Sequence, residues 1–259
     1  MPTFFCSYFV VQRASLNLFV LLAWVCLSGC SAPATHSVLQ SAHPRLALAT
    51  AYYQNGQYRV ALEESQKVSG VLADHAQAFG LQGLIYMRLG EPVLAQKSFL
   101  LAEKAAPLDA DIAHNHAVFL CEQGHYKDSF ERFESAMSRP LYAEKAKTMW
   151  VLGVCYDKYG DVQSAQQIWT QSLNIKATAE TALALALSLK QQNQDARAAA
   201  VLKNFNHLEA ASAETLFLGV QLARQSSDSE TSKRYASLLR LRFPNSSQWG
   251  VLQREAFDD

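Results

Sequence analysis

Apolar and small residues recur at helical spacing along most of this chain, and the same pattern returns after a fixed interval. Gly56, Gly90 and Gly124 are each 34 residues apart, and Ala or Ser follows each glycine after five positions. A period of 34 with these residue types predicts tetratricopeptide repeats, in which two antiparallel helices form one unit that stacks on the next copy.

The second unit, about 76–109, shows this pattern most completely. Its Gly83 and Ala95 are small enough to let the two helices approach closely, and Phe99 fills the space between them. Pro107 ends the second helix, because proline cannot continue the ladder of backbone hydrogen bonds.

Six such units account for nearly all of the chain after residue 41. A short insertion at 140–145 shifts the register by two residues, and the last two units lose most of the glycine and aromatic positions, as expected where an array ends. The expected fold is therefore all-α, a right-handed superhelical solenoid of about six tetratricopeptide repeats built from antiparallel helix pairs. The predicted units span 42–75, 76–109, 110–143, 146–179, 180–213 and 213–246, and a C-terminal tail covers 247–259.

The N-terminus carries a different apolar pattern. Arg13 precedes an apolar stretch over 14–27 that is too short for a spanning helix, which needs roughly 20 residues, and small residues follow it. This order predicts a secretory signal peptide over 1–29. An uncleaved anchor over 4–27 is the alternative, although Gln12 and Arg13 interrupt it, and a true start near Val10 stays open.

The signal ends in Leu27-Ser28-Gly29-Cys30, which resembles the lipobox of bacterial lipoproteins. That resemblance implies acyl chains such as palmitate on Cys30, and two or more chains hold a protein stably at a membrane. Ser31 is not the aspartate that retains lipoproteins at the inner membrane, so we expect an outer-membrane protein that faces the periplasm. Residues 30–41 are small and polar, and they predict a flexible, lipidated tether.

Charge and cysteine content narrow the possible functions. The 23 Lys and Arg balance the 23 Asp and Glu, so the overall charge predicts no electrostatic footprint for nucleic acid or for anionic lipid. After removal of the signal and modification of Cys30, only Cys121 and Cys155 remain. A disulfide between them is possible in an oxidising periplasm, but isolated buried cysteines more often act as small hydrophobic residues, which is the interpretation we favour.

The sequence contains little that suggests catalysis. His114 and His116 point about 200° apart on a helix and therefore cannot chelate one metal together. The repeat register places His116 toward the core and His114 on the open surface. Phosphate-binding loops, nucleophile elbows and His-Glu-x-x-His motifs are absent. We expect no enzyme, no metal or cofactor, and no small-molecule substrate.

A tetratricopeptide array offers a groove lined by the first helix of each unit. The apolar strip of Leu46, Tyr53, Leu84 and Met87, with Arg88 beside it, is typical of surfaces that receive a peptide or strand. The alternative is that these residues pack against the next helix, which we favour for Leu46 and Leu84. The expected groove residues are Leu46, Tyr53, Leu84, Met87, Arg88, His114, Trp150, Asp157 and Lys158.

Several segments resemble one family. Residues 115–126, the insertion at Pro140-Leu141-Tyr142 and residues 239–246 are similar to the PilF/PilW type IV pilus biogenesis lipoproteins, as is the plan of a lipobox, a tether and six repeats. His116-Ala117 departs from the Tyr-Gly that is usual there. This difference puts the likeness of the partner-binding surface in doubt more than that of the fold.

The resemblance implies an assembly function. A protein of this family would act as a pilotin that brings the type IV pilus secretin to the outer membrane and promotes its multimerisation, as required for pilus assembly and twitching motility. The alternative is a scaffold lipoprotein that uses the same groove to recruit cell-wall hydrolases or outer-membrane assembly factors.

Overall fold

The computed structural model describes residues 35–71 and 75–258, which form thirteen helices. The signal peptide and the lipidated Cys30 that the sequence predicts lie outside the described residues. The chain divides into two compact units, residues 1–44 and 45–259, and all the contacts below are within the second. Among the described helices, none combines the length and apolar character needed to cross a lipid bilayer.

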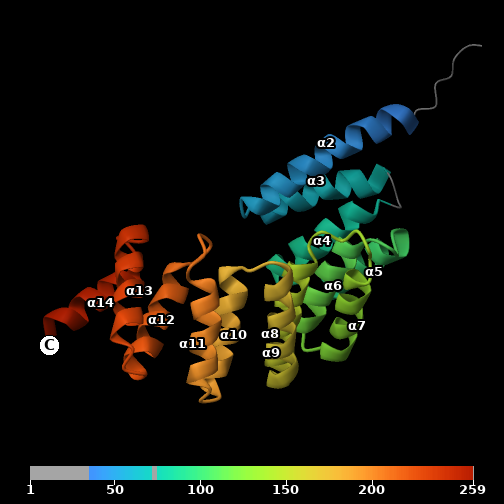
Figure 1. Ribbon diagram of the computed structural model, residues 1–259. Coiled ribbons are helices and arrows are strands. Elements are labelled where there is room, and N and C mark those ends of the chain that lie inside the picture. Colours follow the sequence, from blue (N-terminus) through green and yellow to red (C-terminus); the bar gives the residue numbers. More distant parts are fainter. Residues whose placement is uncertain (1–34, 72–74, 259) are drawn as a thin grey trace, which may run out of the picture. The chain divides into compact units, whose positions relative to one another are not determined.

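Consecutive helices pair along the chain, and each pair is one repeat (Figure 1). The fold class predicted from the sequence, all-α with antiparallel helix pairs, is confirmed. The pairs are, in order, α2 (Thr35–Gln54) and α3 (Tyr58–Val71), α4 (Ala76–Leu89) and α5 (Pro92–Ala105), α6 (Ala110–Glu122) and α7 (Tyr126–Met137), α8 (Lys145–Tyr159) and α9 (Val162–Ile175), α10 (Ala179–Gln191) and α11 (Asp195–Phe205), α12 (Ala213–Gln225) and α13 (Ser229–Arg242).

The turn between the two helices of each pair contains a residue with a left-handed backbone conformation. Gly90 has φ 75° and its N–H returns to the carbonyls of Met87 and Tyr86, which ends α4, and the first, third and fourth repeats also use glycine here. The fifth and sixth repeats keep the same conformation with Asn193 (φ 56°) and Ser227 (φ 57°). The turn is therefore retained where the glycine pattern is lost, although side chains other than glycine are strained there.

Close packing inside the second, fourth and sixth pairs comes from a glycine that faces an aromatic ring 16 positions later. A Cβ on Gly83 would lie 2.8 Å from the ring of Phe99, and one on Gly219 would lie 2.7 Å from the ring of Tyr235. The same relation joins Gly153 to the ring of Trp169. Only glycine allows an aromatic ring to lie this close to the facing helix backbone, which is the packing that the sequence pattern predicts for Gly83 and Phe99.

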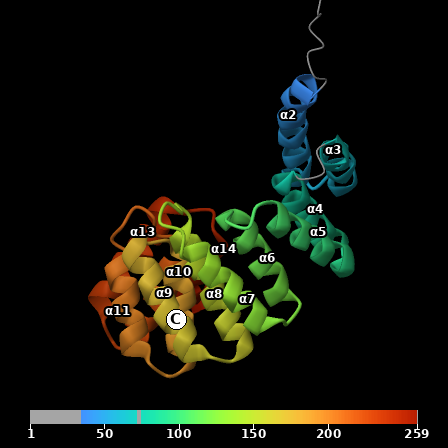
Figure 2. The ribbon, with the colours of Figure 1, turned by 90° about the vertical axis from the view of Figure 1, so that its right-hand side faces the viewer.

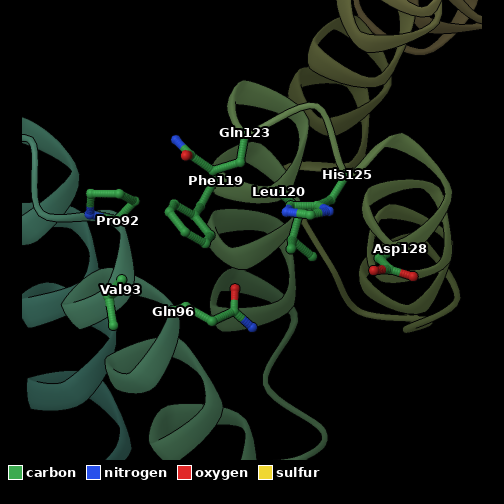
Figure 3. Close-up of a pocket in the computed structure, with 8 residues that line it drawn as sticks. All are labelled: Pro92, Val93, Gln96, Phe119, Leu120, Gln123, His125 and Asp128. Carbon is green, nitrogen blue, oxygen red and sulfur yellow. The ribbon is translucent and has the colours of Figure 1, made fainter.

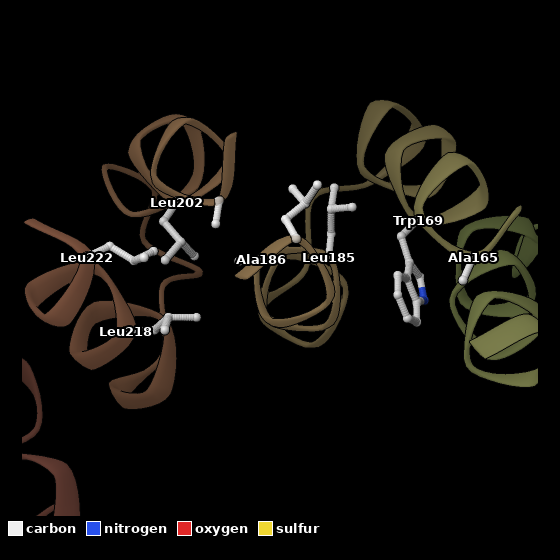
Figure 4. Close-up of a cluster of buried hydrophobic side chains, with 9 residues drawn as sticks. Ala165, Trp169, Leu185, Ala186, Leu202, Leu218 and Leu222 are labelled. Carbon is white, nitrogen blue, oxygen red and sulfur yellow. The ribbon is translucent and has the colours of Figure 1, made fainter. Parts of the chain in front are cut away.

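From α4 onward, first helices contact one another from repeat to repeat, whereas the second helices, among the described helices, contact only their own partner and the following helix. Figure 2 shows α4 beside α5 in this arrangement. One cluster of buried residues therefore extends over parts of the fourth, fifth and sixth repeats. In Figure 4, Leu185 and Ala186 of α10 stand between Trp169 on one side and Leu202, Leu218 and Leu222 on the other.

A disulfide links the third and fourth repeats. Cys121 of α6 is bonded to Cys155 of α8, and their Cα atoms are 5.9 Å apart. The preferred interpretation of these cysteines as unpaired hydrophobic residues is therefore wrong. The two positions are 34 residues apart, and contact between successive first helices brings them face to face.

Both ends of the array contain more helix than the sequence suggests. The expected tether over 30–41 overlaps the start of α2 at Thr35, since residues 35–41 contain no Pro or Gly to oppose a helix. The expected C-terminal tail forms α14 (Ser247–Asp258), which packs on α12 and α13. Its Leu252 is buried, so α14 covers the apolar end of the last repeat.

Candidate partner-binding groove

The surface of the first helices carries one polar and aromatic cluster near the start of the array. Tyr53 at the end of α2 pairs with the ring of Tyr58 at a centroid distance of 5.7 Å. Arg88 at the end of α4 is exposed, and the neighbouring Tyr53 together with the negative charge of Glu122 raises the pKa of Arg88. Aromatic rings and a guanidinium held together in this way are typical of residues that dominate binding energy.

The apolar residues predicted beside this cluster are shared between surface and core. Leu46 packs with Ala49 and Ile85, and Leu84 and Met87 pack against the core around Phe99. All three are half-buried. For Leu46 and Leu84 this agrees with the alternative interpretation, in which they pack against the next helix. The three side chains therefore belong more to the core than to the exposed surface.

A second cluster surrounds Trp150 on α8. Trp150 lines a cavity of about 400 Å³ between the starts of α8 and α10, and the charged residues Lys147, Lys176, Glu144 and Glu180 also line it. The Trp150 carbonyl accepts a hydrogen bond of 3.0 Å from the indole N–H of Trp169, which fixes this part of α8. A cavity lined by an aromatic residue and by charges of both signs suits a polypeptide with one apolar side chain among polar ones.

Asp157 and Lys158 do not take part in this cavity. Both are exposed near the end of α8, and the residues that line the cavity do not include them. The structure therefore divides the predicted groove residues into a Tyr53–Arg88 cluster, a Trp150 cavity and an exposed pair.

His114 is not on the open surface, so that expectation is wrong. Its side chain is only 7% exposed, its Nδ1 lies 2.9 Å from the hydroxyl of Thr148, and its ring meets Phe133 edge-on. Thr148 in turn bonds Tyr142 at 2.9 Å, so the insertion after α7 closes over this position. Burial, together with the charge of Lys147, lowers the pKa of His114 to about 4.

His116 is fully buried, as the repeat register predicts. It stacks on Phe99, and its Nδ1 lies 2.8 Å from a Glu103 oxygen that Arg132 also contacts at 3.3 Å. Burial alone would raise the pKa of Glu103, but hydrogen bonds and charge from His116 and Arg132 hold it below its usual value. The sequence analysis missed this network, whose members lie on three helices and share no short motif.

A further hollow of about 400 Å³ lies between α5, α6 and the start of α7 (Figure 3). Val93 and Gln96 of α5 face Phe119 and Gln123 of α6 across it, and His125 stands at one side. The residues contributed by α5 and α6 lie 23 or more positions apart in the chain, so repeat spacing alone does not reveal this hollow.

Comparison with known proteins supports the resemblance seen in the sequence. No family model matches the chain. The chain is 24% identical over 251 residues to the type IV pilus assembly protein PilF of Pseudomonas aeruginosa, covering 94% of this chain and 98% of that protein. The similarity therefore extends along almost the full length of both proteins.

Two solved structures share the fold. The structure of Pseudomonas aeruginosa PilF matches with a TM-score of 0.67 and 23% identity, over 85% of this chain and 99% of that one. The structure of PilW, described as a widely conserved type IV pilus biogenesis factor, matches with a TM-score of 0.65 and 24% identity, over 83% and 99%. The likeness to the PilF/PilW proteins that the sequence motifs indicate is thus confirmed in sequence and in fold.

Proposed function

Since this chain resembles PilF and PilW in sequence and in fold, we propose that it is a type IV pilus assembly factor. The observation that carries this proposal is the similarity to PilF along 94% of the chain and 98% of the relative, which leaves no large domain of either unmatched. The matched relative is named as an assembly protein, which supports the expectation that this chain is not an enzyme.

In its finer form, the proposed role is that of a pilotin. The predicted lipid on Cys30 would hold the chain at the inner face of the outer membrane, and the first-helix surface would bind the type IV pilus secretin. Lipid and surface have separate tasks, because one determines location and the other determines the partner.

Two features of the first-helix surface support protein binding. The Tyr53–Arg88 cluster offers an exposed cation beside an aromatic ring, and the Trp150 cavity offers a recess that an apolar side chain could enter. Tyr, Trp and Arg are the residue types that most often carry the binding energy of protein interfaces. A secretin segment that carries a carboxylate at one end and an apolar side chain farther along would satisfy both.

A deletion strain tests the proposed function. We expect loss of surface pili and of heat-resistant secretin multimers, with secretin monomers remaining, and recovery of both on expression of the wild-type chain. Normal piliation in the deletion strain would overturn the proposal, and a division or envelope defect in its place would favour the scaffold alternative.

Replacement of Cys30 by serine tests the lipid separately. We expect both the chain and the secretin to leave the outer-membrane fraction. If both stay there at wild-type levels, the escort by a lipid anchor is wrong even if pilus assembly depends on the chain.

A further inference from the structure

The outer side of α5 is an apolar face that no other described helix covers. Among the described helices, α5 contacts only α4 and α6, and it lies at the right-hand edge of the ribbon in Figure 1. Val93 is 80% exposed, Leu100 49%, Leu94 40% and Leu101 37%. Lys97 and Lys104 are exposed within the same face, one helical turn from these residues.

The corresponding positions of neighbouring second helices are polar. On α7 they are Lys127, Asp128, Glu131, Glu134, Ser135 and Ser138, and on α9 they are Gln163, Ser164, Gln167, Thr170, Gln171 and Asn174. Because α5, α7 and α9 occupy equivalent places in their repeats, packing within the array does not require apolar side chains at these positions of α5. The α5 face, defined as Val93, Leu94, Lys97, Leu100, Leu101 and Lys104, therefore has no counterpart in the third and fourth repeats.

We propose that the α5 face lies against an anionic lipid surface. Leucine and valine side chains would enter the boundary between headgroups and acyl chains, while the two lysines extend their ammonium groups to lipid phosphates. Lys97 and Lys104 are seven residues apart, or about 10 Å along the helix, so both can reach headgroups of one leaflet while the helix lies flat.

The positive charge of the α5 face favours an anionic partner. No carboxylate belongs to it, and Glu103 is turned away toward His116 and Arg132. A second copy of this chain is a poor occupant, because a symmetric contact would bring four lysines together. Lysine is also depleted at the centre of protein interfaces, whereas leucine and lysine together are typical of helices that lie on membranes.

This contact is independent of the proposed secretin binding. The groove candidates lie on first helices, and the α5 face lies on a second helix, so a membrane contact here leaves the first-helix surface free for protein. It also goes beyond a lipid anchor, which determines distance from the bilayer but not orientation.

Photocrosslinking in vesicles tests the proposal. The photoreactive residue benzoylphenylalanine replaces Leu101 or, as the matched control, the exposed Gln171 at the same position of α9. The full chain is purified from bacterial membranes, reconstituted into vesicles of phosphatidylethanolamine with or without phosphatidylglycerol, and irradiated, and lipid adducts are measured by mass spectrometry. We expect about five-fold or more adduct at 101 than at 171, and a decrease when phosphatidylglycerol is omitted.

A charge variant completes the test. Lys97→Glu with Lys104→Glu should reduce the adduct at 101 several-fold, and Lys127→Glu with Lys203→Glu, which makes the same charge change on other second helices, should not. Circular dichroism confirms that each variant is folded. Equal adducts at 101 and 171, absence of adduct at 101, or an unchanged adduct in the Lys97→Glu and Lys104→Glu variant would each overturn the proposal.

Discussion

The helix pairs of the third and fourth repeats have the same geometry as those of the fifth and sixth repeats. Different interactions stabilise the two regions. The earlier pair contains the Cys121–Cys155 disulfide, a buried chain of side-chain hydrogen bonds from His114 through Thr148, and two glycine turns. The later pair depends on leucine and alanine packing around Leu202 and closes its turns with Asn193 and Ser227. Repeat geometry therefore constrains shape and volume at each position more than it constrains the type of interaction.

Of the changes considered, removal of the disulfide in the third and fourth repeats should lower the unfolding free energy the most. The bond closes a separation of 34 residues, so Cys121→Ala with Cys155→Ala should lose about 4 kcal/mol of unfolding free energy through a freer unfolded chain. Denaturant unfolding measures this loss. A reductant should destabilise the wild type and leave the double variant unchanged, and an unchanged wild type would contradict the expectation.

A cavity in the later repeats should cost slightly less. Leu202 is fully buried in the core shared by α10, α11 and α12, so Leu202→Ala should lose about 3 kcal/mol. The exposed Leu187 provides the control, because Leu187→Ala should change the unfolding free energy little. Similar losses from the two variants would mean that the core around Leu202 is not tightly packed.

Acid should weaken the earlier repeats selectively. The pKa of His114 falls from 6.5 to about 4 on folding, so the stability it contributes is complete above pH 6.5 and is lost as the pH falls toward 4. At pH 5 the loss should be about 2 kcal/mol, from the difference in proton binding. His114→Gln should remove this part of the pH dependence, and an identical pH profile in wild type and variant would exclude it.

The smallest expected change in stability concerns the turns of the fifth and sixth repeats. Ser227 has a positive φ that glycine adopts without steric cost, so Ser227→Gly should stabilise the chain by about 1 kcal/mol. Asn193→Gly should gain less, because asparagine tolerates the left-handed conformation. Thermal unfolding compares the two variants, and a loss of stability in Ser227→Gly would contradict the expected strain.

Repeat spacing was sufficient to predict much of the fold. The glycines 34 residues apart and pairs such as Gly83 with Phe99 depend only on contacts inside one repeat, so a single sequence displays them. Contacts between repeats were harder to predict. His114 is buried because Thr148 and Tyr142 of the following segment close over it, and its own helix gives no sign of that.

The same limit applies to the candidate site. Tyr53, Arg88 and Trp150 could be selected because position within a repeat determines which helix face they occupy. The proximity of Arg88 to Tyr53 and the cavity around Trp150 each require two first helices side by side. The disulfide was missed for this reason, since its cysteines meet only where successive first helices touch.

Direct binding of the secretin tests the proposed use of the first-helix surface most closely. The full chain, its Arg88→Glu variant and its Trp150→Ala variant would be compared for binding to purified secretin by calorimetry, with Lys127→Ala as a surface control and thermal unfolding as a check on folding. We expect at least about tenfold weaker binding for Arg88→Glu and Trp150→Ala and no change for Lys127→Ala. Wild-type affinity in both groove variants would contradict the central claim that the secretin is bound by the first helices.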